Sequence, residues 1–163
     1  MSRLAELHAK VDGFFARVEA RHGADMQCST GCSDCCHVRL TITHVEAAAI
    51  RALVTSWPAE QRAALAAVGP VDRCAALDPT GRCKIYEARP IVCRSHGAPI
   101  RMRRDSLPVI ESCFRNFTQT EPAAECVLDQ QTLSALTLAV DRDAGGTGER
   151  VELVALVNEL TRV

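Results

Sequence analysis

Four cysteines within nine residues constrain this chain more than any other feature of its sequence. They stand in the run C-S-T-G-C-S-D-C-C, at Cys28, Cys32, Cys35 and Cys36. Thiolates are the preferred ligands of zinc, Cu(I) and iron–sulfur cores, and exposed clustered thiols without a ligand oxidise readily. The Ser, Thr, Gly and Asp residues between the cysteines favour turns. The run therefore predicts a soft-metal or iron–sulfur site in a loop.

Composition argues against a disulfide scaffold. A chain of 163 residues can bury an ordinary hydrophobic core without covalent staples, and its nine cysteines cannot all pair. The first 21 residues mix charged and apolar side chains and do not resemble a secretory signal. We expect a cytoplasmic protein whose thiols stay reduced.

Charge and aromatic content argue against two classes of partner. With 19 basic and 20 acidic residues, four Phe, one Tyr and one Trp, the chain offers neither a basic surface nor a stacking platform for nucleic acid. No segment approaches the run of about 20 apolar residues that a membrane span needs. The basic stretch at Arg101, Arg103 and Arg104 is predicted to be a solvated loop.

Hydrophobic periodicity predicts helices over much of the chain. Apolar residues recur at helical spacing from Leu4 to Val18, and Gly23 would end this helix. A capping pattern at Thr43 and Glu46 begins a second helix that runs to about Trp57. Further helices are predicted over 58–68, 120–140 and 151–160, with a helical turn over 84–88 and an extended stretch over 38–43. In the helix after Thr120, one side is predicted to carry Leu128, Leu133, Leu136 and Val140.

These elements predict a mainly α fold, a small single-domain helical fold with irregular loops wrapped around a cysteine-rich metal centre. Along the chain we expect an N-terminal amphipathic helix over 1–24 and a metal-binding core over 25–118. A C-terminal helical segment over 119–163 is expected to pack on the core.

The first cysteine block forms half of a site. Cys28, Cys32 and Cys35 follow one another at steps of four and three, so their sulfurs can face one centre in a loop or a loose helical turn. Cys36 is expected to point away from Cys35, because adjacent side chains diverge in helices and strands. It therefore either completes the site through an irregular backbone or serves a second metal.

The remaining ligands are expected from a second block, which supplies Cys74, Cys83 and Cys93, with Cys113 further on. Eight thiols can form two four-sulfur sites, or one such site and a separate reactive pair, and spacing does not divide them. His96 is either a ligand, a base beside Cys93, or an exposed or supporting residue. Cys126 is predicted to be a buried free cysteine.

A buried thiolate site needs positive charge or hydrogen-bond donors around it. Four thiolates around Zn²⁺ or a [4Fe–4S]²⁺ core leave a net charge near −2, which is costly away from water. Residues close to the cysteines in sequence can offset this charge by hydrogen bonds to sulfur. The candidates are Arg39, Tyr86, Arg89 and Arg94.

Two blocks together resemble a known family. They are C-x3-C-x2-C-C followed by V-R-L-T-I-T-H-V-E, and C-x8-C-K-I-Y-E-A-R-P-I-V-C-R. They are similar to the YkgJ-type cysteine-cluster family of zinc- or iron-chelating proteins over roughly residues 26–117. That resemblance implies eight metal-ligating cysteines, carried onto Cys28, Cys32, Cys35, Cys36, Cys74, Cys83, Cys93 and Cys113.

The sequence predicts a metal-binding protein. We expect an iron–sulfur cluster, for example [4Fe–4S], in a redox carrier, sensor or accessory protein. The alternative is a zinc-binding structural or interaction module, or a metal chelator, with one or two four-cysteine sites. The sequence shows no catalytic motif, so an enzyme is the weaker hypothesis, with Cys36 or Cys113 as the candidate reactive thiol. It identifies no redox or protein partner.

Overall fold

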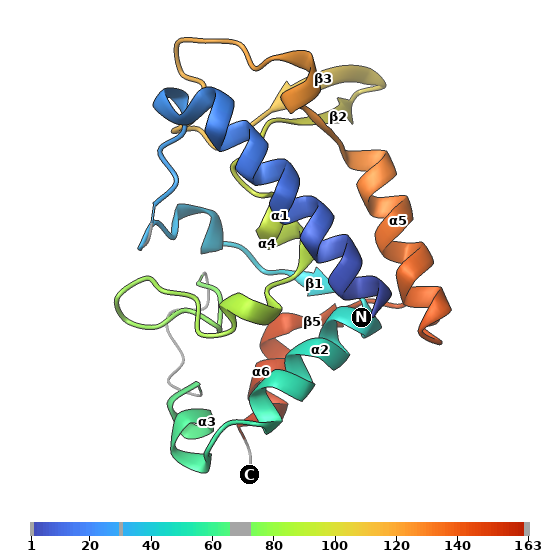
Figure 1. Ribbon diagram of the computed structural model, residues 1–163. Helices are drawn as coiled ribbons and strands as arrows, with labels where there is room; N and C mark the ends of the chain where they lie inside the picture. The colour runs from blue at the N-terminus through green and yellow to red at the C-terminus, as the bar shows by residue number, and fades with distance from the viewer. Residues whose placement is uncertain (1, 30, 66–72, 162–163) are drawn as a thin grey trace. The chain divides into compact units, whose positions relative to one another are not determined.

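The computed structural model describes residues 2–29, 31–65 and 73–161. The chain forms two units, each built from two segments (Figure 1). Unit 1 comprises Met1–Ser29 and Ile91–Val140, and unit 2 comprises Thr30–Pro90 and Asp141–Val163. Six α-helices and five short strands lie in the described part of the chain. The mainly helical prediction is therefore confirmed in outline, while the division into 1–24, 25–118 and 119–163 stays a prediction.

Unit 1 is organised around its first helix, α1 (Arg3–His22). The hydroxyl of Ser2 accepts a hydrogen bond from the backbone N–H of Ala5 and caps the helix start. Leu7 and Val11 are buried against Ile91 of the short helix α4 (Ile91–Ser95), which lies beside α1 in Figure 1. The long helix α5 (Gln130–Asp143) contributes side chains to the same cluster.

A small sheet completes unit 1. Strand β2 (Ile100–Arg104) pairs with β3 (Leu107–Glu111) in an antiparallel hairpin and with β4 (Leu128–Asp129) in parallel. Asp105 and Ser106 form the hairpin turn with φ of 48° and 69°, the left-handed values typical of two-residue hairpins. A further buried cluster in this unit consists of Val18, Met26, Ala98 and Cys126.

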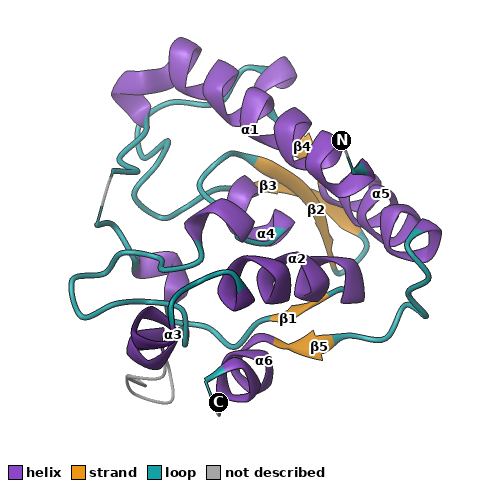
Figure 2. Cartoon of the chain, turned by 60° about the horizontal axis from the view of Figure 1, so that its bottom comes forward, coloured by secondary structure: helices purple, strands orange, loops and turns teal. Residues whose placement is uncertain are grey.

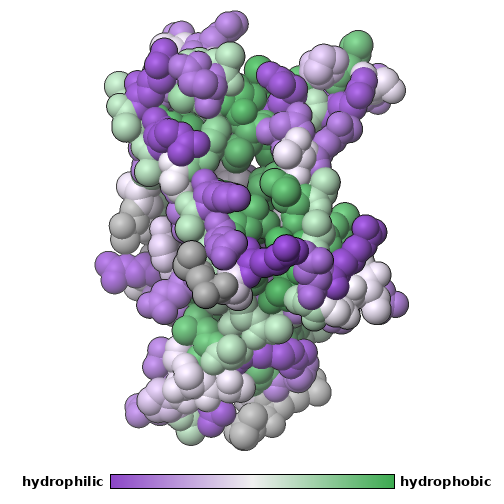
Figure 3. Space-filling view, turned by 45° about the vertical axis from the view of Figure 1, so that its right-hand side comes forward, coloured by the Kyte–Doolittle hydropathy of each residue, from purple (hydrophilic) through white to green (hydrophobic). Residues whose placement is uncertain are grey.

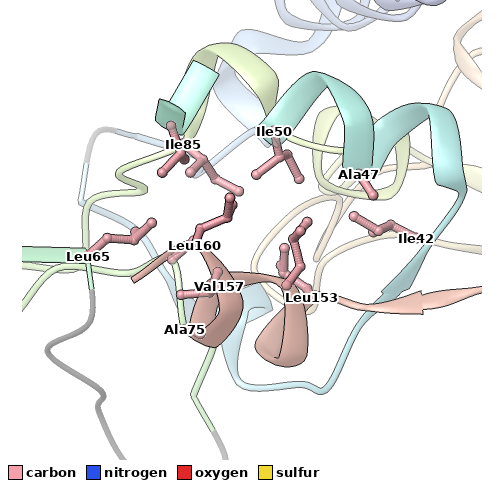
Figure 4. Close-up of a cluster of buried hydrophobic side chains, with 12 residues drawn as sticks. Ile42, Ala47, Ile50, Leu65, Ala75, Ile85, Leu153, Val157 and Leu160 are labelled. Atoms are coloured by element: carbon pink, nitrogen blue, oxygen red, sulfur yellow. The ribbon is translucent and has the colours of Figure 1, made fainter. Parts of the chain in front are cut away.

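Unit 2 is built on two helices that face each other across a shared core. Helix α2 (His44–Thr55) packs against α6 (Leu153–Leu160), and the strands that precede them, β1 (Thr41–Ile42) and β5 (Val151–Glu152), pair antiparallel (Figure 2). Side chains from both helices point toward one another in Figure 4. The core contains Ile42, Ala47, Ile50, Val54, Leu65, Ala75, Ala76, Ile85, Leu153, Leu156, Val157 and Leu160.

The first turn of α2 is fixed by two buried carboxylates. Glu46 Oε2 accepts hydrogen bonds from the backbone N–H and the hydroxyl of Thr43, each at 2.8 Å. Asp141 Oδ1 accepts from the backbone N–H of Val45 at 2.8 Å. The predicted capping box therefore forms, and it sets the position at which α2 begins.

Several predicted elements are confirmed. Helix α1 and helix α2 form over the expected ranges, and Tyr86–Ala88 forms the expected helical turn. The third helix, α3, is Ala59–Leu65, and the remainder of its predicted range lies outside the described residues.

Three predictions are wrong in detail. The basic stretch at Arg101, Arg103 and Arg104 is strand β2 and not a loop, because Ile100 and Met102 alternate with the arginines at the two-residue period of a strand. Leu128 lies in β4, since α5 begins only at Gln130. Leu136 is 48% exposed, whereas Leu133 and Val140 pack against the buried cluster of α1.

Two further observations concern the surface. Among the described residues, no helix has both the length and the apolar character needed to cross a bilayer. Hydrophilic side chains are interspersed with apolar ones over the face drawn in Figure 3.

Candidate metal centre

Two adjacent cysteines of unit 2 present their sulfurs together. Cys35 and Cys36 lie in a 3-10 turn (Asp34–Cys36), in which the backbone N–H of Cys36 donates to Ser33 O at 2.8 Å. Their Sγ atoms are 3.9 Å apart. Thiolates on one tetrahedral ion with metal–sulfur bonds of about 2.3 Å stand about 3.8 Å apart. The expected divergence of the two side chains is therefore wrong, because the tight turn brings them to the same side.

A second loop approaches this turn through the backbone. The N–H of Cys74 donates to the carbonyl of Cys36 at 2.7 Å. A β-bridge between Leu77 and Cys83, with a 2.8 Å bond from Lys84 N to Ala76 O, closes the loop that joins Cys74 and Cys83. Unit 2 therefore holds the backbones of four cysteines close together.

Two features fix the shape of this loop. Asp78 Oδ1 accepts hydrogen bonds from the backbone N–H groups of Thr80 and Arg82 and from the Thr80 hydroxyl, all within 2.9 Å. Gly81 has φ +83°, and a Cβ there would stand 3.0 Å from the carbonyl oxygen of Gly31. A side chain at position 81 would thus press on the first cysteine loop.

The protonation of these thiols reflects their surroundings. Burial raises the pKa of Cys83 to about 11, although a backbone hydrogen bond from Ile85 and the nearby Arg89 guanidinium oppose the shift. Burial likewise raises the pKa of Cys74, against a backbone hydrogen bond from Ala76. The hydrogen bond with the Cys36 thiol lowers the pKa of Cys35 to about 7. Cys35 and Cys74 also raise the pKa of Cys83 through their charge, so these three sulfurs influence one another.

The four residues predicted to offset the sulfur charge take different positions. The Arg89 guanidinium lies 4.0 Å from the ring centre of Tyr86 and close enough to Cys83 to affect its thiol. Arg39 is exposed. Arg94 is 8% exposed, and its Nη1 donates to Asp12 of α1 at 2.6 Å. Their hydrogen bonding to metal-bound sulfur stays a prediction.

The other cysteines are distributed over both units. Cys32 is half-buried in the first cysteine loop of unit 2. Cys28, Cys93 and Cys113 belong to unit 1 and are also half-buried. Cys126 is 3% exposed among apolar side chains, so its predicted burial is confirmed. His96 is exposed.

The donor set fits a thiophilic metal, although its sulfurs do not all converge. Within the described ranges, no three His, Cys, Asp or Glu side chains lie closely enough together to enclose an ion. The Cys35–Cys36 sulfur separation nevertheless matches two ligands of one ion, and the backbone bonds hold Cys74 and Cys83 beside them. Four thiols of this kind suit zinc or iron.

The comparison with known families agrees with this chemistry. The model of the CxxCxxCC family, described as a "putative zinc- or iron-chelating domain", matches residues 27–126. The chain belongs to this family. The resemblance found from the two cysteine blocks is therefore confirmed, and zinc or iron binding is supported. No curated protein and no solved structure matches the chain.

Sequence reasoning missed three residues that shape the cysteine loops. Asp78 stands in D-P-T-G, a turn signal that does not by itself indicate a link to the cysteines. Asn116 and Gly97 contact Cys28 across 88 and 69 positions of the chain, a separation at which local patterns carry no signal.

Proposed function

We propose that unit 2 binds a single zinc or iron ion through the thiolates of Cys35, Cys36, Cys74 and Cys83. The 3.9 Å between the sulfurs of Cys35 and Cys36 carries this proposal, because it is the spacing of two thiolates on one tetrahedral ion. In a [4Fe–4S] core each iron binds one cysteine sulfur, so two cysteine sulfurs that bind the same metal ion do not fit such a core. The protein then acts as a metal-stabilised interaction or accessory module.

The chain's own residues prepare this site. The backbone N–H groups of Ala76 and Ile85 hydrogen-bond the sulfurs of Cys74 and Cys83, each two residues earlier. Such bonds stabilise thiolates and orient them toward a metal. Arg89 supplies positive charge beside Cys83. Cys74 and Cys83 also pack on the hydrophobic core of unit 2, so a bound ion would tie the loops to that core.

An iron–sulfur cluster in a redox carrier, sensor or accessory protein is the second candidate. It is favoured by the number of thiols in unit 2, because Cys32 adds a fifth cysteine to the four proposed above. Three of the four-thiol group together with Cys32 could then hold one cluster, with a [4Fe–4S] core as the expected form.

Purification without oxygen separates the two candidates. We expect stoichiometric zinc or iron without acid-labile sulfide, and a protein that is colourless with zinc. Labile sulfide in proportion to iron, with a brown colour that bleaches with oxidant, would overturn the single ion and support the cluster. The double variant Cys74→Ser/Cys83→Ser should lose the metal of unit 2. The control Cys126→Ala should retain it, because this sulfur packs among apolar side chains.

A further inference from the structure

The hairpin of β2 and β3 in unit 1 (Figure 1) has two faces that differ in burial. Residues directly opposite each other in paired strands share a face, and the side chains of a strand alternate between the faces. One face carries Met102 and Val109, which are half-buried, and Leu128 of β4, which packs against a buried cluster. The other face points away from that cluster.

This second face is exposed and combines two cations with two apolar side chains. Arg101 lies opposite Ile110, and Arg103 lies opposite Pro108. All four side chains are exposed, and Ile110 is 51% exposed. We call these four residues the arginine face.

The charge of the arginine face is positive. Arg103 Nη2 donates to the backbone carbonyl of Ser106 at 3.2 Å, a contact that does not neutralise its charge. Arg101 lies opposite Asp129 of β4, whose Oδ1 accepts from the backbone N–H of Thr132 at the start of α5. Two guanidinium groups thus lie beside one carboxylate, which leaves the face with a net positive charge at neutral pH.

The third arginine of β2 differs from the other two. Arg104 forms an ion pair with Glu111, and the register places both residues on the opposite face from Arg101 and Arg103. The two faces of the hairpin therefore differ in charge as well as in burial.

The spacing of the two exposed arginines fits an extended peptide. Side chains two residues apart on a strand are separated by about 6.8 Å, and the same spacing separates alternate side chains of an extended ligand. A guanidinium group binds a carboxylate through two parallel hydrogen bonds. Carboxylates at positions i and i+2 of a peptide therefore match Arg101 and Arg103, and Ile110 offers an apolar contact beside them.

The face of the hairpin suits a ligand better than its edge does. The sheet order is β3-β2-β4, so β3 is an edge strand. Pro108 of β3 has no backbone N–H, and a proline in an edge strand hinders the addition of another strand. A net charge of −1 over the whole chain provides no long-range attraction for nucleic acid or an anionic membrane. Arginine beside apolar side chains is instead typical of protein interfaces.

We propose that the arginine face binds an extended acidic segment of a partner protein. Two carboxylates at positions i and i+2 bind Arg101 and Arg103, and an apolar side chain of the same segment packs on Ile110. The inference goes beyond metal binding by unit 2, since all of these residues belong to unit 1.

A peptide titration of the metal-loaded full chain, followed by NMR, tests the proposal. The probe is acetyl-Glu-Ser-Glu-Ser-Leu-amide, in which both carboxylates and the leucine lie on one side of the extended chain. We expect shifts at Arg101, Arg103 and Ile110 that weaken with added salt. The isomer acetyl-Glu-Glu-Ser-Ser-Leu-amide has the same charge but turns one carboxylate away, so it should bind about threefold more weakly or less. Equal affinity of the two peptides, or no shifts, would overturn the proposal and leave metal binding by unit 2 standing.

Two matched pairs of variants test which face is used. Arg103→Gln should weaken the probe about threefold or more, whereas Arg104→Gln removes the same charge from the other face and should change its affinity less than about 1.5-fold. Ile110→Thr retains a β-branched residue and should weaken the probe about twofold. Leu107→Thr is its control, since Leu107 is exposed on the face of Arg104. Equal losses within either pair would overturn the assignment of the face.

Phosphate ligands test the choice of occupant. We expect a duplex DNA oligonucleotide and phosphatidylserine vesicles to shift the resonances of the arginine face less than the probe does. Tighter binding of either one, lost in Arg103→Gln, would show a surface for phosphate and would overturn the acidic protein segment.

Discussion

At the scale of single residues, Asp78 has the clearest supporting role in unit 2. Its carboxylate holds the loop between Cys74 and Cys83 by bonds to Thr80 and Arg82. We expect Asp78→Ala to weaken metal binding by unit 2 about tenfold, because the two thiols lose their fixed spacing. Metal affinity in competition with a chelator measures this change.

Asp129 offers a matched control for Asp78. Its Oδ1 accepts a 2.8 Å bond from the backbone N–H of Thr132 at the start of α5, in unit 1. Asp129→Ala should leave the affinity of unit 2 unchanged, and equal losses in both variants would contradict the prediction. The backbone N–H of Arg82 and the Thr80 hydroxyl lower the pKa of Asp78. The Asp78 carboxylate therefore stabilises the loop fully at neutral pH, and this stabilisation is lost only as the pH falls through that lowered pKa.

Cys35 should be the most reactive thiol of the metal-free site. The hydrogen bond with the Cys36 thiol lowers its pKa to about 7, whereas burial raises the pKa of Cys83 to about 11. Since the thiolate is the nucleophile, a brief treatment with iodoacetamide at pH 7 after chelation should modify the peptide of Cys35 first. Its rate should fall as the pH drops below about 7. Peptide mapping by mass spectrometry measures both, and equal rates for Cys35 and Cys83 would contradict the prediction.

The sequence predicts the local clustering of the cysteines better than their grouping in space. Clustering of cysteines is local, so Cys28 to Cys36 could be recognised directly. Their grouping depends on contacts such as Cys74 N to Cys36 O, which join positions 38 residues apart and leave no periodic signal. Turn geometry also decided the position of Cys36, because a 3-10 turn places neighbouring side chains differently from a helix or strand.

At the scale of elements, the start of α2 depends on the buried carboxylate of Glu46. Its Oε2 accepts both the backbone N–H and the hydroxyl of Thr43, and both residues are almost fully buried. Glu46→Ala leaves these donors without their acceptor, so we expect a loss of about 2 kcal/mol in the free energy of unfolding. Glu46→Gln retains an acceptor oxygen and should lose less than half as much. Urea unfolding of the metal-loaded protein gives both values.

An exposed glutamate serves as the control for Glu46. Glu60 lies in the first turn of α3 and is exposed. Glu60→Ala should change the unfolding free energy by less than about 0.5 kcal/mol. A loss in Glu46→Ala no larger than this would show that the capping box contributes little to the stability of unit 2.

Helices proved easier to predict than strands for a physical reason. Helices α1 and α2 carry their signals in their own sequence, as a repeating apolar face and a capping pair. The hairpin of β2 and β3 depends on pairing between strands, and its turn uses Asp105 and Ser106 in place of glycine. Three of the five residues of β2 are arginines, so the segment was interpreted by its basic composition and the alternation of Ile100 and Met102 was missed.

At the scale of the whole molecule, the two units should respond differently to metal removal. In unit 2, Cys74 and Cys83 pack on the core, while the loops that carry them are held by a few backbone bonds. We expect a chelator to raise hydrogen exchange at least tenfold, equivalent to about 1.4 kcal/mol, in the cysteine loops over 31–40 and 73–90. Helices α2 and α6 should be affected less, because their own contacts remain.

Helix α1 provides the internal reference for this measurement. Its N-terminal half is capped by Ser2 and packed through Leu7 and Val11 on Ile91, contacts that involve no thiol. Protection in 3–12 should therefore persist after chelation, and restored zinc should return the loops of unit 2 to their original exchange rates. Uniform loss of protection over both units would instead show that the metal holds the entire chain folded, as in small domains that unfold without zinc. Unchanged exchange in 31–40 and 73–90 would contradict a stabilising ion, because an ion bound by these loops must slow their opening.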